Sequence, residues 1–172
     1  MNPEPSSVPE SDVFDDWRWH VEGAFPAGRE PEQGYVHIGV FVAWLARHDM
    51  LAAATRGGDA AGAIDAVVDR SGSFMALLGP TSGRLTRAML QPDGQAFAGA
   101  YYAPEYGYPR DWRSSFGRRA DSYSVPATWD TYDRLEPVLD RRHAEWIAAG
   151  RPELMPLPGL LGRLARLLDR RT

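Results

Sequence analysis

The chain has 172 residues, which is enough for one domain with a hydrophobic core of its own. It contains no cysteine, so disulfides, thiol catalysis, zinc–thiolate sites and iron–sulfur clusters are all excluded. The formal net charge of −4 argues against a general nucleic-acid-binding protein, which usually has a basic surface. All 19 basic residues are arginine, which we interpret as the bias of a GC-rich genome rather than a binding feature.

The two ends of the chain differ in composition from its middle. Residues 1–12 are rich in Pro, Ser and Glu and are predicted to be disordered. They lack the basic and apolar regions of a secretory signal, and no apolar run in the chain approaches the ~20 residues that span a bilayer. We therefore expect a cytoplasmic protein without a transmembrane segment. The rest is expected to divide into a domain of residues 13–150 and a linker with an amphipathic helix in residues 151–172.

The first half of the domain contains the strongest core signal. Residues 17–23 alternate weakly between apolar and polar side chains, which favours a short strand or an extended arm. Residues 36–48 follow, with apolar side chains at intervals of three and four on more than one face. This pattern predicts a central helix that is buried on most sides, in which Gly39 and Ala43 allow another element to approach closely.

Further helices are predicted after residues that suit the N-cap position. They are a helix capped by Asp59 that runs to Arg70, one of residues 74–78 capped by Ser73, one of residues 94–102 capped by Asp93, and a turn of residues 129–135 capped by Thr128. Pro104 and Pro109 are expected to break the chain into an aromatic loop, and Pro137 suits the first turn of a new helix that ends at Gly150. The fold class predicted is mainly α, a single compact helical domain with a short extended N-terminal arm and little or no sheet. The alternative is an α+β fold with a small sheet.

The last residues carry a clean amphipathic stripe of leucines. It comprises Leu157, Leu160, Leu161, Leu164, Leu167 and Leu168. Pro156 and Pro158 separate this stripe from the domain. We expect it to pack on the domain or to form a homodimer through the C-terminal helix, rather than to bind a membrane.

Several motifs together resemble an uncharacterised bacterial domain family. They are Trp-His at 19–20 followed by Phe-Pro at 25–26, His-Ile-Gly-x-Phe-x-Ala-Trp at 37–44, and Thr-Trp-x-x-Tyr-Asp-x-Leu-x-Pro-Val-Leu-Asp-x-Arg at 128–142. The resemblance covers residues 14–146. Because the family is a domain of unknown function, the resemblance implies a fold unit and little chemistry. The chain departs from the family pattern at Ala24, where the family tends to carry an acidic residue.

Two histidines and a carboxylate are the candidate metal ligands. If residues 17–23 form a strand, His20 and Glu22 project from the same face, and His37 would complete a two-histidine, one-carboxylate set. Nothing in the sequence brings the two segments together, and a histidine near a helix start is more often a hydrogen-bonded structural residue. Metal binding by His20, Glu22 and His37 is therefore an alternative interpretation.

The aromatic loop is the candidate binding surface. It combines rings with arginines, as protein interfaces often do. The residues chosen within it are Tyr106, Tyr108, Trp112, Arg113 and Arg118. The competing interpretation is a solvated loop whose rings attach it to the core.

The sequence contains no complete catalytic or cofactor motif, so catalytic residues are not identified and no cofactor is expected. The leading prediction is a non-enzymatic protein-binding module with a protein partner, in its specific version an immunity protein that neutralises a bacterial toxin. That version rests on analogy with other small acidic domains. The alternatives are a small metal-dependent hydrolase and a nucleotide- or ligand-binding protein.

Overall fold

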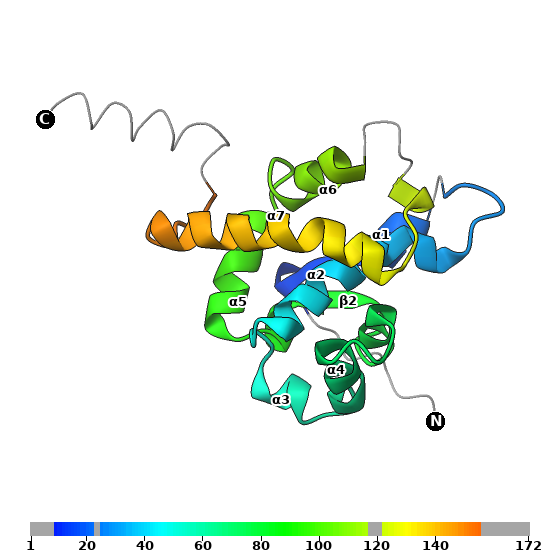
Figure 1. Cartoon of the computed structure of the whole chain (residues 1–172), viewed down its shortest axis with the longest axis horizontal. Helices are drawn as coiled ribbons and strands as arrows, with labels where there is room; N and C mark the ends of the chain where they lie inside the picture. The colour runs from blue at the N-terminus through cyan, green and yellow to red at the C-terminus, as the bar shows by residue number, and fades with distance from the viewer. Residues whose placement is uncertain (1–8, 23–24, 117–121, 156–172) are drawn as a thin grey trace, which may run out of the picture.

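A computed structural model describes residues 9–22, 25–116 and 122–155 (Figure 1). This part of the chain is mostly helical, with a single pair of antiparallel strands, so the predicted mainly α class is confirmed. No helix in these ranges is both long enough and apolar enough to cross a membrane. The predicted leucine helix and most of the N-terminal segment lie outside the described residues.

The elements follow one another closely along the chain. The α-helices are α1 (Arg18–Val21), α2 (Val36–Arg47), α3 (Ala53–Arg56), α4 (Ala61–Val68), α5 (Pro92–Phe97), α6 (Tyr108–Phe116) and α7 (Trp129–Ala148). The 3-10 helices are η1 (Glu10–Asp12), η2 (Pro31–Tyr35), η3 (Phe74–Leu78), η4 (Arg87–Met89) and η6 (Ser122–Ser124), and η5 (Ala98–Tyr102) is a π-helix. The strands are β1 (Val13–Asp16) and β2 (Arg84–Thr86), which pair with Asp15 opposite Leu85 and an irregularity between Val13 and Asp15.

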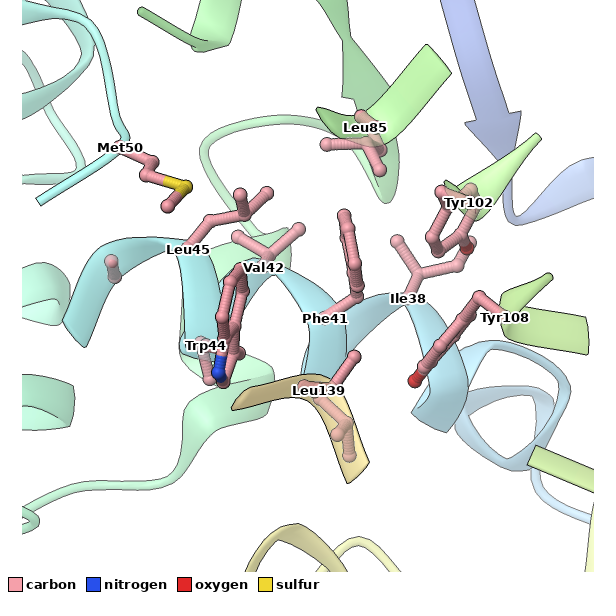
Figure 2. Close-up of a cluster of buried hydrophobic side chains, with 14 of the residues drawn as sticks. Ile38, Phe41, Val42, Trp44, Leu45, Met50, Leu85, Tyr102, Tyr108 and Leu139 are labelled. Atoms are coloured by element: carbon pink, nitrogen blue, oxygen red, sulfur yellow. The ribbon is translucent and has the colours of Figure 1, made fainter. Parts of the chain in front are cut away.

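Helix α2 is the centre of the molecule, as its apolar pattern predicted. Every one of its residues except His37 and Arg47 is buried. In the close-up of the core, its side chains lie between Leu85 of β2 and Leu139 of α7 (Figure 2). The predicted close approach occurs at Gly39, where an added Cβ would lie 2.7 Å from the sulfur of Met75 in η3.

Helix α7 runs across one side of the molecule and is longer than predicted (Figure 1). Thr128 caps it as expected, because its side chain accepts a hydrogen bond from the backbone N–H of Thr131. The prediction that Pro137 starts a new helix is wrong, since Pro137 lies inside one continuous helix. The buried positions, which include Leu135 and Leu139, continue at helical spacing through the proline. Burial of this stripe outweighs the backbone hydrogen bond that proline cannot donate.

The prediction of a strand or extended arm in residues 17–23 is also corrected by the structure. Residues 18–21 form a helical turn rather than a strand, and the strand lies just before them. The cause is local, because Asp16 Oδ1 accepts a hydrogen bond from the backbone N–H of Arg18 at 3.0 Å and satisfies a free donor at the helix start. Within the segment predicted to be disordered, residues 10–12 form η1.

Two of the predicted caps and the aromatic loop also differ from the structure. Helix α4 follows Ala60 rather than Asp59, and α5 begins at Pro92, whose fixed backbone angle suits the first helical position better than a cap at Asp93. The cap predicted at Ser73 is confirmed by its hydrogen bond from the N–H of Met75. Much of the predicted aromatic loop is helix α6, because its proline falls in the first turn, where no N–H is needed.

Candidate metal centre

Three side chains with metal-ligating atoms converge from three separate elements. Asp15 comes from β1, His20 from α1 and His37 from the first turn of α2. Nε2 of His20 lies 2.6 Å from Asp15 Oδ1, and Nε2 of His37 lies 3.3 Å from Asp15 Oδ2. One ligand atom from each residue lies within 4.8 Å of the other two. Among the described residues this is the one group of three or more such side chains with that spacing.

The backbone around the three residues explains why they meet. The irregularity in the strand pair directly precedes Asp15, and such irregularities re-aim side chains near functional sites. Gly34 of η2 lets α1 approach, because an added Cβ there would lie 2.6 Å from a methyl group of Val21 and 3.7 Å from Cβ of His20. The two histidine rings then meet edge to face, with their centroids 4.4 Å apart.

The carboxyl group of Asp15 is buried and charged. Burial by itself would raise its pKa, but the hydrogen bonds to His20 and His37 outweigh burial and hold the pKa well below its usual range. Burial also lowers the pKa of His37, which the neighbouring carboxylate only partly offsets. At neutral pH the site therefore offers an anionic oxygen and a neutral imidazole, the forms in which these groups bind a metal.

Tyr102 gives Asp15 a third partner. Its hydroxyl donates a hydrogen bond of 2.5 Å to Asp15 Oδ2 inside the protein. Burial, together with the charge of Asp15, raises the pKa of Tyr102 well above its usual value, so the hydroxyl stays protonated. Tyr102 belongs to the π-helix η5, a rare backbone form that often occurs at functional sites.

The triad borders a pocket of about 300 Å³. Its lining also includes Phe14, Gly34, Tyr102, Ala103, Glu105, Tyr108, Pro109, Trp112, Arg113 and Tyr123. The rings of Trp112 and His37 lie with their centroids 5.9 Å apart, and the Tyr108 hydroxyl donates to the backbone carbonyl of His37 at 2.9 Å. Helix α6 therefore forms an aromatic wall beside the candidate ligands.

A buried ion pair holds that wall in place. Arg142 of α7 makes two hydrogen bonds to Asp111 of α6, of 2.6 Å and 3.1 Å, and Tyr101 of η5 donates a third at 2.9 Å. A bidentate pair of this kind fixes orientation as well as distance. It ties α6 to α7 and to the π-helix that carries Tyr102.

Two nitrogens and one carboxylate oxygen form a ligand set suited to a divalent transition-metal ion. Ligand bonds to such ions are about 2.0–2.2 Å long. An ion among the three atoms would replace the direct hydrogen bonds of Asp15 with bonds to the metal, after a small separation of the side chains. Three protein ligands leave at least one coordination position free, as catalytic zinc sites do.

The structure brings together two of the three ligands named from the sequence. His20 and His37 meet, but Glu22 is exposed and does not belong to the group. Asp15 takes its place. The expectation that His20 and Glu22 share a strand face depended on an extended segment that is in fact helix α1. The available signal was a pair of aspartates, Asp15 and Asp16, between apolar and aromatic residues, a setting that indicates buried acids without singling out Asp15.

The residues named for the binding surface have different environments. Tyr108 and Trp112 are buried, with 1% and 4% of their surface exposed, and they face the pocket rather than open solvent. Tyr106 is half-buried, and Arg113 is exposed at the pocket lining. Arg118 lies outside the described residues.

Comparison with known proteins gives one result. A search of the curated proteins and a search of the solved structures found no match to this chain. A family described as a domain of unknown function, DUF7832, matches residues 13–125. The match begins one residue before the predicted start of the resemblance at residue 14, and it ends before α7, short of the predicted end at residue 146. It includes Asp15, His20, His37 and Tyr102. The chain belongs to the DUF7832 family.

Proposed function

We propose that this domain is a small metal-dependent hydrolase. It binds one divalent transition-metal ion through Asp15, His20 and His37 and receives a small molecule in the adjoining pocket. The observation that carries the proposal is the convergence of these three side chains, from three elements, at the wall of one pocket.

The character of the site supports a catalytic ion over a structural one. Structural zinc sites usually have four protein ligands, whereas catalytic sites have three and leave a position for water or substrate. The described residues supply three ligands here, beside a pocket of about 300 Å³. A divalent ion bound there would supply a metal-bound water of lowered pKa, which is the nucleophile of metal-assisted hydrolysis.

The residues around the three ligands also support a catalytic ion. Tyr102 orients the carboxylate of Asp15 through its hydrogen bond of 2.5 Å, and hydrogen-bonded outer residues of this kind are usual around metal ligands. Two buried aromatic residues of α6, Tyr108 and Trp112, form one side of the pocket. Protein binding, including toxin neutralisation, stays a prediction. Two of the three rings named for that surface, Tyr108 and Trp112, are buried beside the pocket.

The test is metal analysis of purified protein after chelation and reconstitution with Zn²⁺ or Mn²⁺. We expect about one tightly bound ion per chain in the wild type, and loss of that ion in D15N, H20Q and H37Q. Two matched controls should retain it. E22Q removes an exposed carboxylate close to His20, and H48Q removes a histidine that is bonded to Asp140 instead.

Thermal unfolding of every variant checks that the fold is intact. A metal content at background in the wild type, or an unchanged content in the three ligand variants, would contradict the proposal. If the ion binds, hydrolysis is tested with a panel of nitrophenyl esters and phosphates. The D15N variant should lose any turnover together with the metal.

A further inference from the structure

We infer that the pocket binds a small molecule in which an oxyanion, either carboxylate or phosphate, is joined to a flat apolar group, and that Arg113 selects the oxyanion. The inference rests on the proposed metal site, because the charge of the pocket depends on the ion. It specifies the class of molecule that the site would take.

The charged side chains of the pocket are few. Among the described residues of the lining they are Asp15, Glu105 and Arg113, and the two histidines are neutral when they bind a metal. These three groups leave one net negative charge, which a divalent ion converts to one net positive charge. Because opposite charges attract, the metal-loaded pocket favours an anion and the ion-free pocket disfavours it.

Arg113 is able to exchange its partner. It forms an ion pair of 3.1 Å with Glu105, and the two side chains are 53% and 82% exposed. Exposed pairs of this kind contribute little to stability. An arriving carboxylate or phosphate can therefore replace Glu105 and accept two parallel hydrogen bonds from the guanidinium fork.

The wall beside Arg113 determines the rest of the ligand. Arg113 follows Trp112 on α6, and the Trp112 ring lies against the rings of His37 and Phe116, with centroid distances of 5.9 Å and 4.7 Å. Phe14 adds another ring to the lining. Flat rings pack best against flat apolar groups. A volume of about 300 Å³ lies at the lower limit for ligand pockets, so the ligand is small.

The experiment is calorimetric titration of the zinc-loaded chain with benzoate and with benzamide, which share a shape and differ in charge. We expect benzoate to bind at least about tenfold more tightly than benzamide, and R113Q to abolish this preference. R110Q is the matched control, because Arg110 is an exposed residue of the same helix that is absent from the pocket lining. The chelated chain should bind neither compound.

A further titration uses phenyl phosphate in place of benzoate. The anion that binds more tightly shows whether the pocket takes a phosphate or a carboxylate. Equal affinity for benzoate and benzamide would overturn the inference. An equal loss of the preference for benzoate in R110Q and R113Q would also overturn it, because such a loss reports only the overall charge of the chain. Absence of binding by a chain that holds one zinc ion would also overturn it. Failure to retain zinc is a different result, which contradicts the proposed metal site itself.

Discussion

At the scale of residues, Asp15 is where the interactions of the site meet. Its carboxylate receives hydrogen bonds involving His20, His37 and Tyr102, while 7% of the residue remains exposed. A buried charge without such partners would be strongly unfavourable. The three partners keep the group ionised inside the protein, and an ionised carboxylate beside neutral imidazoles is what a divalent metal requires.

Removal of the Tyr102 hydroxyl tests whether it positions Asp15. We expect Y102F to bind Zn²⁺ about 10–100-fold more weakly than the wild type, because the carboxylate loses its orienting donor. The measurement is competition with a chromogenic chelator. Y132F is the matched control, since Tyr132 is also a buried tyrosine, but its hydroxyl donates to Glu136 and it is absent from the pocket lining. Equal zinc affinity in Y102F and wild type would show that Tyr102 serves the core alone.

At the scale of elements, α7 depends on tertiary packing to remain continuous. Pro137 stands in its interior and is exposed. We expect P137A to raise the free energy of unfolding by about 1–3 kcal/mol, because alanine is much more favourable than proline inside a helix. Urea unfolding followed by circular dichroism measures the change. If Pro137 instead occupied a first helical turn, the variant would have unchanged or lower stability.

The elements that were predicted correctly have local signals. Helix α2 has its apolar spacing, and Ser73 and Thr128 are caps whose hydrogen bonds close within a few residues. Two of the features that were missed, strand β1 and the continuity of α7, depend on distant partners. Strand β1 pairs with β2, which is remote in the chain, and α7 passes Pro137 because its inner face is covered by the core.

The candidate site was partly predictable for the same reason. His20 and His37 could be named by residue type, but their meeting depends on the contact of α1 with η2 and α2. Asp15 could not be matched to them without the strand pairing that places it. Tyr108 and Trp112 were named from the sequence as anchors of a binding surface. They are buried because α6 is a helix that packs on α2 and α7.

At the scale of the whole molecule, the candidate site lies within the segment that matches the family. The ligands, Tyr102 and the described lining all fall in residues 13–125. Helix α7 lies beyond the match and contributes through Arg142, which holds α6. Among the described residues, α7 therefore supports the wall of the pocket and contributes none of its lining.

The stability of the molecule should depend on pH through His143. Burial lowers its pKa, with a further contribution from His48 and a smaller one from Arg151, against the opposing charges of Asp93 and Asp140. The unfolded chain takes up a proton near the ordinary pKa of about 6.5, while the folded chain resists it. The free energy of unfolding should therefore be full above that pH and decrease as the pH falls through the window between the ordinary pKa and the lowered one.

Urea unfolding of wild type and H143Q at several values between about pH 5 and pH 7 measures this dependence. His37, whose pKa burial also lowers, contributes in the same direction and remains in the variant. We expect a smaller dependence on pH in H143Q than in the wild type. Identical profiles would show that His143 is not protected from protonation in the folded state.

The metal site itself is tested most directly by anomalous diffraction at the zinc edge from crystals grown with Zn²⁺. The proposal predicts one strong peak at about 2.0–2.2 Å from Nε2 of His20, Nε2 of His37 and a carboxylate oxygen of Asp15. It also predicts that the direct contact of 2.6 Å between His20 and Asp15 is lost in those crystals. Zinc-saturated crystals with no peak among these three residues, and with that hydrogen bond intact, would contradict the proposal.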